Sequence, residues 1–155
     1  MTLNHEHYMA LALDEARKAE AAGEVPIGAV LVHTQTGAVI TGGNRTITRS
    51  DPTAHAEIEV IREACRIEGA QRIPEYDLYV TLEPCAMCAG AISFARIRRV
   101  VFGASDPKGG GILHGGKFYD QPTCHHRPLV EHGTMAEECG NLLKTFFAKK
   151  RGKTD

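Results

Sequence analysis

A helix-length segment between two short β-rich runs is the feature that most restricts how this chain can fold. The runs are 78–82 and 99–102, and residues 84–95 between them have the length and composition of a helix. Helical crossovers join strands that run parallel, because a tight hairpin can only join antiparallel strands. The sequence therefore predicts an α/β fold with parallel strand pairing at its centre.

The remaining segments extend this alternation in both directions. Apolar residues recur at helical spacing from Tyr8 to Ala19, and we expect this first helix to stop near Gly23. The runs 28–32 and 38–41 are separated by the turn-like residues 35–37, which predicts an antiparallel hairpin. Further elements are expected as a helix at 55–66 that ends at Gly69, a strand at 129–131 and a helix at 135–150.

Composition sets the size and the environment of the protein. A chain of 155 residues with 43% hydrophobic content predicts one domain, residues 1–155. No apolar run reaches the roughly 20 residues of a membrane-spanning helix, and residues 1–5 lack the pattern of a signal peptide. Five cysteines do not form the paired framework of a small secreted domain, so we expect a soluble cytoplasmic protein without a membrane partner. A net charge of -1 restricts any nucleic-acid contact to a local patch.

Two short motifs at expected helix starts carry side chains that bind metals. They are His55-Ala56-Glu57 and Pro84-Cys85-Ala86-Met87-Cys88. Pro84 suits the first turn of a helix, and two cysteines three residues apart lie on nearly the same helix face. One imidazole and two thiolates leave the fourth tetrahedral position of a zinc ion open for water, as a catalytic zinc requires. We therefore predict one zinc held by His55, Cys85 and Cys88, although a Cys-x-x-Cys alone can also be a redox pair.

Glu57 distinguishes this pattern from a structural metal site. A metal makes its bound water acidic, and hydrolysis then needs a group that takes the proton and returns it to the substrate. Residues two apart on a helix point in nearly opposite directions, so His55 and Glu57 converge only if the metal lies beyond the helix end. We predict Glu57 as the catalytic proton carrier.

Beyond these motifs the chain resembles the zinc-dependent cytidine and deoxycytidylate deaminase superfamily, and within it the bacterial tRNA-specific adenosine deaminases. The resemblance extends over most of the chain and is carried by residues 24–30, 43–45, 51–57, 78–85 and 98–104. It implies a three-layer α/β/α fold around a five-stranded mixed sheet, one zinc per chain and a homodimer.

The resemblance also implies a reaction, the conversion of the wobble adenosine of a tRNA anticodon to inosine. Zinc-bound hydroxide would attack C6 of adenine, while Glu57 delivers the proton to N1 and then to the leaving amine. Carried over by position, Asn44 would hydrogen-bond the target base, and Ile27, Asp106 and Phe147 would lie near the nucleotide.

The substrate is the part of this interpretation that the motifs alone leave open. Residues 104–128 predict a long loop with substrate contacts, and its Gly109-Gly110-Gly111 segment departs from the pattern of the tRNA enzymes. Relatives that act on free guanine or cytosine share both motifs, so a free nucleobase or nucleoside is the alternative substrate. A third interpretation is a zinc-stabilised binding module, in which Cys65, Cys124 or a second histidine would complete four protein ligands.

Overall fold

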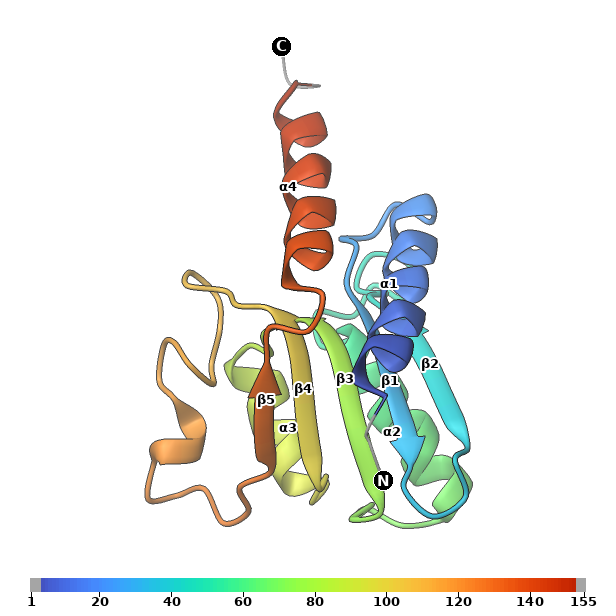
Figure 1. Ribbon diagram of the computed structural model, residues 1–155, viewed down its shortest axis with the longest axis vertical. Helices are drawn as coiled ribbons and strands as arrows, with labels where there is room; N and C mark the ends of the chain where they lie inside the picture. Colours follow the sequence, from blue (N-terminus) through green and yellow to red (C-terminus); the bar gives the residue numbers. More distant parts are fainter. Residues whose placement is uncertain (1–3, 153–155) are drawn as a thin grey trace.

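A five-stranded mixed sheet crosses the centre of the protein, whose computed structural model describes residues 4–152 (Figure 1). The strand order is β2-β1-β3-β4-β5. β1 pairs antiparallel with β2 and with β3, whereas β3–β4 and β4–β5 are parallel. The strands are β1 (Gly28–His33), β2 (Val39–Gly43), β3 (Tyr76–Leu82), β4 (Arg99–Ala104) and β5 (Leu129–His132). The expected hairpin and the expected parallel pairing are both confirmed.

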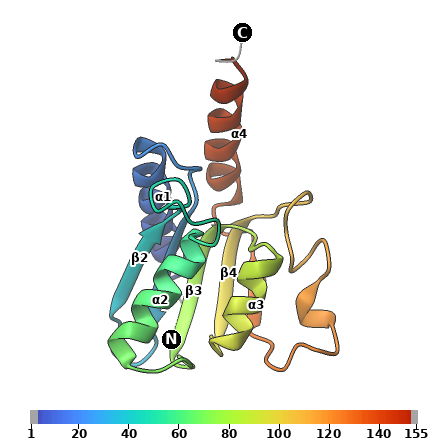
Figure 2. The same ribbon diagram turned by 180° about the vertical axis from the view of Figure 1, so that it is seen from behind.

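Four helices pack against this sheet. α1 (His5–Ala21) and α4 (Ala136–Gly152) contact one face, and α2 (Ala56–Glu68) and α3 (Ala86–Phe94) lie on the other (Figure 2). α4 contacts β3 and β4 and extends beyond the end of the sheet (Figure 1). The three-layer α/β/α arrangement is therefore confirmed. None of the helices within residues 4–152 combines the length and the apolar composition needed to cross a membrane. The expected domain 1–155 and the N-terminal segment 1–5 include residues 1–3 and 153–155, which lie outside the described residues.

The side-chain alternation of the strands explains why helices pack on both faces. Val30 lies opposite Tyr79, which lies opposite Val101, and all three side chains belong to the core beneath α1. The next residue along each strand faces the other way, into the core beneath α2 and α3. These central strands are buried on both sides, so each apolar run stabilises two layers.

Gly28 allows α1 to pack closely on β1, and Gly69 and Cys85 mark the ends of two helices near the site. A Cβ added at Gly28 would lie 1.9 Å from the carbonyl oxygen of Ala12, so α1 can approach β1 only over a glycine. Gly69 ends α2 in the left-handed conformation at φ 65°, as expected. α3 begins at Ala86 and not at Pro84, because Cys85 has an extended backbone and is the N-cap.

The long segment between β4 and β5 is tied to α3 by side-chain hydrogen bonds. It contains one short 3₁₀ helix, η1 (Phe118–Asp120). The Tyr119 hydroxyl donates to the carbonyl of Ala89 at 2.9 Å, and the Ser93 hydroxyl donates to that of His126 at 2.7 Å. The expected loop is thus present and held against the same helix that carries Cys88.

Candidate metal centre and active site

His55 reaches its position through a tight turn built by the residues before it. The Asp51 carboxylate accepts hydrogen bonds from the backbone N–H of Thr53 at 2.8 Å and from its hydroxyl at 2.6 Å. His55 is the N-cap of α2, with an extended backbone and no side-chain hydrogen bond to its own helix. Asp51 and Thr53 therefore shape the turn ahead of the helix, and the imidazole points away from α2.

Cys85 and Cys88 are placed by the first turn of α3. Cys85 is the N-cap, and its side chain makes no capping bond. Cys88 follows three positions later and is fully buried. Both sulfurs lie at a helix N-terminus, where the partial positive charge of the helix favours the thiolate form.

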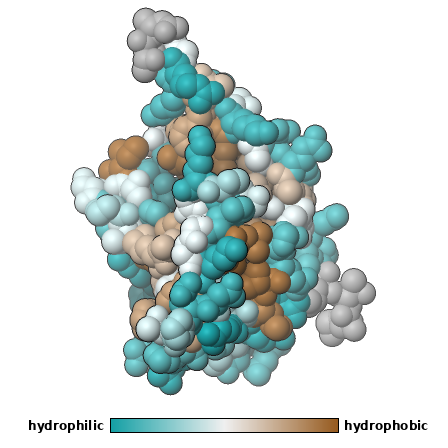
Figure 3. All heavy atoms as spheres, turned by 90° about the vertical axis from the view of Figure 1, so that its left-hand side faces the viewer, coloured by the Kyte–Doolittle hydropathy of each residue, from teal (hydrophilic) through white to brown (hydrophobic). Residues whose placement is uncertain are grey.

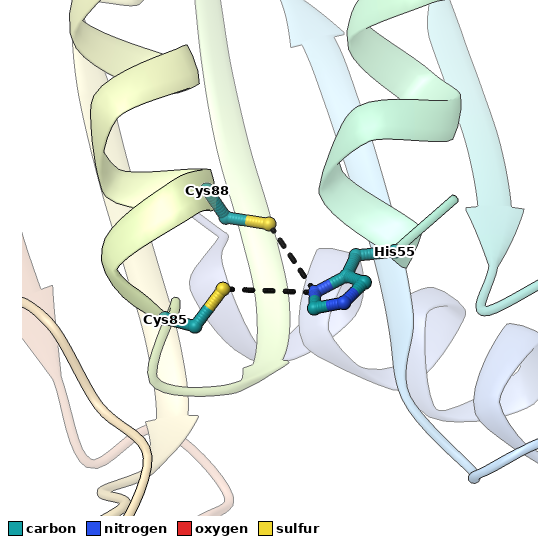
Figure 4. Close-up of side chains that lie close together, drawn as sticks. All are labelled: His55, Cys85 and Cys88. Carbon is teal, nitrogen blue, oxygen red and sulfur yellow. Dashed lines mark hydrogen bonds between the residues drawn. The ribbon is translucent and has the colours of Figure 1, made fainter. Parts of the chain in front are cut away.

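The three predicted ligands converge on one point (Figure 4). The Sγ atoms of Cys85 and Cys88 each lie 3.6 Å from Nδ1 of His55, and all the potential ligand atoms lie within 4.8 Å of one another. Zinc bonds of about 2.3 Å to sulfur and about 2.0 Å to nitrogen, at tetrahedral angles, separate sulfur from nitrogen by about 3.6 Å. The donor set and its spacing therefore fit a single zinc ion.

The imidazole of His55 faces both sulfurs through Nδ1. Its hydrogen bond with Cys85 is the largest cause that raises the pKa of His55, while partial burial opposes that shift. The ring is thus oriented with Nδ1, one of the two nitrogens that can bind a metal, toward the two cysteines.

Glu57 lies beside the cluster, in the first turn of α2, with 4% of its surface exposed. Burial raises the pKa of its carboxyl to about 7. A carboxyl group with a pKa near neutrality can both accept and release a proton under ordinary conditions. His55 has an extended backbone and lies just before α2, so its side chain does not follow the helical spacing. The imidazole and the Glu57 carboxyl can therefore point to the same side.

The pKa values of the two thiols shift in opposite directions because their side chains interact. The contact with Cys88 is the largest cause that lowers the pKa of Cys85, to about 4, and His55 adds to it. The contact with Cys85, together with burial, raises the pKa of the Cys88 thiol well above its usual range. Both sulfurs would bind a cation as thiolates.

A cavity of about 180 Å³ opens next to the cluster. His55, Glu57 and Cys85 line it on one side. Ile27 and Asp106, which the sequence placed near the nucleotide, also line it. A small molecule or a base that enters this cavity would therefore contact His55, Cys85 and Glu57 together.

The other two residues expected near the substrate lie outside this cavity. Asn44 follows β2 and lines a neighbouring cavity of about 180 Å³ with Glu24 and Arg45. Its Oδ1 is buried and has no hydrogen-bond partner within the part of the chain that the structure describes. Phe147 lies on α4 with 44% of its surface exposed and does not line the cavity beside the metal cluster.

Glu83 is a residue of this cavity that the sequence interpretation did not single out. Its side chain is completely buried, and it accepts hydrogen bonds from the backbone of the loop after β4 and from His114. Burial alone would raise the pKa of its carboxyl, but these hydrogen bonds outweigh it and the pKa is lowered. The sequence did contain one signal for this role, an acidic residue directly after a strand expected to be buried. A carboxylate in such a place must accept several hydrogen bonds to offset its burial.

Three donors for one metal beside a cavity, with a buried acid that lines the same cavity, fit a catalytic zinc site. The His-x-Glu and Pro-Cys-x-x-Cys elements that build it are the signature of the hydrolytic zinc deaminases. Comparison with known proteins gives the family. The family model described as "Cytidine and deoxycytidylate deaminase zinc-binding region" matches residues 2–104. The chain belongs to the cytidine and deoxycytidylate deaminase family, and the prediction of a zinc cofactor is confirmed at the level of that family.

Individual relatives cover nearly the whole chain. A protein from Agrobacterium fabrum named "tRNA-specific adenosine deaminase" is 58% identical over 146 residues, which are 94% of this chain and 95% of the relative. A solved structure from work on A-to-I editing by tRNA:A34 deaminases superimposes with a TM-score of 0.85 at 59% identity, covering 88% of this chain and 99% of that one. A guanine deaminase structure from Bacillus subtilis has a TM-score of 0.63 at 32% identity, with 96% and 95% coverage.

Proposed function

We propose that this protein deaminates the wobble adenosine of a tRNA anticodon to inosine, with zinc held by His55, Cys85 and Cys88. The observation that carries the proposal is the position of the buried Glu57 carboxyl, which shares one cavity with two of these three side chains. Zinc, when bound, supplies an acidified water as nucleophile near neutral pH.

Glu57 performs the proton transfers of this reaction. Its carboxylate takes a proton from the attacking water and delivers it to N1 of adenine as the oxygen bonds to C6. It then passes the second proton of the water to the exocyclic nitrogen, which leaves as ammonia, and the product is inosine. The buried Glu57 carboxyl lines the cavity beside the candidate metal ligands, where it can reach both the water and the base.

The choice of a tRNA loop as substrate rests on the relatives and on the chemistry of access. The relatives from Agrobacterium fabrum and Bacillus subtilis, both named tRNA-specific adenosine deaminases, are 58% and 48% identical to this chain, whereas the guanine deaminase structure is 32% identical. A base can enter a closed pocket only after it is unstacked, and an anticodon loop permits this at lower cost than a duplex. A cytoplasmic location follows from this substrate.

A free nucleobase is the alternative substrate, because a guanine deaminase shares the fold across 96% of this chain. The non-catalytic binding module has less support. Cys124 contacts Ser93 and Cys65 contacts the backbone of Gln71, so neither approaches the cluster as a fourth ligand.

The deciding experiment compares substrates directly. The zinc-loaded protein is incubated with an anticodon stem-loop that carries adenosine at the wobble position, and separately with guanine, cytosine and free adenosine. We expect inosine in the stem-loop and no turnover of the small molecules. Turnover of a free base without turnover of the stem-loop would overturn the tRNA assignment and leave the deaminase chemistry intact.

The functional unit is inferred to be a homodimer. Figure 3 shows apolar side chains gathered on the side of the molecule that carries β5 and the long loop. Phe94 on α3 and Leu129 on β5 have 72% and 56% of their surfaces exposed. Large apolar side chains that are exposed in a single chain are often covered at interaction surfaces of soluble proteins. Light scattering after size-exclusion chromatography should give the mass of two chains, and a monomer mass at micromolar concentration would contradict this inference.

A further inference from the structure

The Glu83 carboxylate collects the N–H groups of a single loop. Oε1 accepts from the backbone N–H of Asp106 at 3.0 Å and pairs with Nδ1 of His114 at 2.8 Å. Oε2 accepts from three consecutive backbone N–H groups, which are those of Ile112 (3.1 Å), Leu113 (2.8 Å) and His114 (3.2 Å). One fully buried side chain thus organises both ends of residues 106–114.

The middle of this loop is folded onto the same support. The Asp106 side chain accepts from the backbone N–H of Lys108 at 3.2 Å and of Gly109 at 3.0 Å. The backbone N–H of Gly110 donates to the Asp106 carbonyl at 2.9 Å, and that of Gly111 donates to the Pro84 carbonyl at 2.8 Å. The loop is therefore one hydrogen-bonded unit that is anchored on the residues just before Cys85.

Two glycines of this loop lie directly against the Glu83 anchor and the start of α3. A Cβ added at Gly110 would lie 2.3 Å from Oε2 of Glu83 and 2.4 Å from its Cδ. A Cβ added at Gly111 would lie 2.7 Å from the backbone nitrogen of Ala86, at the start of α3. Gly116, farther along the same loop, has no atom within 4 Å of an added Cβ. Gly110 and Gly111 are therefore required for close packing, whereas Gly116 is not.

The anchored loop forms a wall of the cavity beside the metal cluster. Glu83, Asp106 and Gly109 line that cavity together with Glu57 and Cys85. Ile27 and the start of α2 also line this cavity and belong to other parts of the chain. Movement of residues 106–114 would therefore change the shape of the substrate space.

We propose that Glu83 is the positioning residue for the substrate wall formed by residues 106–114. It acts on the substrate through the loop, and the proposal rests on the proposed function for the identity of that substrate. A carboxylate is suited to this task because its two oxygens can accept from several donors at once, and the Glu83 side chain is fully buried.

The first test is Glu83→Gln, which preserves the shape of the side chain and replaces one acceptor oxygen by a donor. Loss of loop contacts should raise KM for the anticodon stem-loop by roughly tenfold or more and leave kcat within about threefold. Zinc content should stay at one ion per chain. Wild-type kinetics, a fall in kcat alone or loss of zinc would each overturn the proposal.

The second test approaches the same contact from the loop side, with a matched control. Gly110→Ala inserts a methyl group against the Glu83 carboxylate and should also raise KM by roughly tenfold. Gly116→Ala adds the same methyl group to the same loop in open space and should leave KM, kcat and thermal stability unchanged. Equal effects of the two substitutions would overturn the proposal. If Glu83→Gln does not fold, this pair of variants still tests whether the contact with Glu83 positions the loop.

A third readout separates this proposal from the assignment of substrate. Amide hydrogen exchange of the zinc-loaded protein should show protection at Ile112, Leu113 and His114, and Glu83→Gln should remove it without changing exchange in β3. If the wild type fails to deaminate the stem-loop, the tRNA assignment falls while the exchange result still decides whether Glu83 holds the loop. Unchanged exchange in Glu83→Gln would overturn the positioning role whatever the substrate is.

Discussion

His55 and Cys85 are the N-cap residues of two different helices, and neither side chain caps its own helix. Both have extended backbones, and the imidazole and the thiol turn toward each other to a distance of 3.6 Å. An N-cap side chain ordinarily satisfies a backbone N–H at its own helix end. Here both helix ends give up that contact, and the cluster gains two donors and the partial positive charge of two helix N-termini.

Substitution of one candidate zinc ligand should lower both the zinc content and the thermal stability of the protein. Cys85→Ala leaves two donors, so we expect loss of zinc and a lower melting temperature. A ligand present at 1,000 times its Kd stabilises the folded state by about 4 kcal/mol, which is the scale of the expected loss. Elemental analysis and thermal unfolding measure both quantities. Cys65→Ala, outside the cluster, is the control and should retain zinc; zinc retained in Cys85→Ala at the wild-type level would remove Cys85 from the ligand set.

Removal of the Glu57 carboxyl should separate chemistry from metal binding. Glu57→Gln and Glu57→Ala should retain one zinc per chain and lose deamination by about 100-fold or more in kcat, the scale of general acid–base catalysis. Inosine formation in the stem-loop measures the loss. Glu63→Gln alters a partly exposed carboxylate of the same helix, which pairs with Arg66, and should stay active. Near-normal turnover by Glu57→Ala would contradict the proton-transfer role.

Asn44 should matter more for substrate than for stability. Because its buried Oδ1 has no internal hydrogen-bond partner, Asn44→Ala removes an unpaired polar atom and should change the free energy of unfolding by less than about 1 kcal/mol. The same substitution should lower kcat/KM for the stem-loop by roughly tenfold or more, if this oxygen bonds to the substrate. Urea unfolding and steady-state kinetics test the two halves. A large loss of stability with unchanged kcat/KM would reverse the assignment.

Acid stability should depend on Glu24, a buried carboxylate at the start of the segment before β1. Burial raises the pKa of its carboxyl, but hydrogen bonds from the hydroxyl and N–H of Thr48 and from Ile47 outweigh burial and hold the pKa below the ordinary 4.5. The unfolded chain therefore takes up this proton first. Its stabilisation is complete above about pH 4.5 and is lost as the pH falls through the lower folded pKa.

Glu24→Gln tests that dependence through urea unfolding as a function of pH. At pH 7 the variant should be less stable than the wild type by about 2 kcal/mol, the scale of hydrogen bonds to a charged acceptor. The difference should shrink as the pH falls below 4.5. A constant difference between pH 7 and pH 3 would show that the charge of Glu24 does not contribute.

Periodicity and local chemistry predicted most of the fold. Each expected helix and strand is present, because helical spacing in 8–19 and β-rich runs such as 78–82 report local burial directly. The antiparallel pairing of β1 with β3 was not predicted, since contacts between segments so far apart leave no local pattern. The start of α3 was placed two residues early because Pro84 is typical of a first turn.

The cluster of candidate metal ligands was easier to predict than the surroundings of the substrate. His55, Cys85 and Cys88 are identified by residue type and spacing, and their convergence requires only two helix starts. Glu83 was missed because its role depends on backbone N–H groups of a loop more than twenty positions away, which residue types do not reveal. Phe147 was carried over by resemblance alone, and its place on an exposed part of α4 leaves its role as a prediction.

X-ray absorption at the zinc edge of the purified protein tests the central claim most directly. The account predicts two sulfur neighbours at about 2.3 Å and two nitrogen or oxygen neighbours at about 2.0 Å, one from His55 and one from solvent. In Cys85→Ala the two-sulfur shell should disappear. Three or four sulfur neighbours, or a shell without sulfur, would contradict a catalytic zinc held by His55, Cys85 and Cys88.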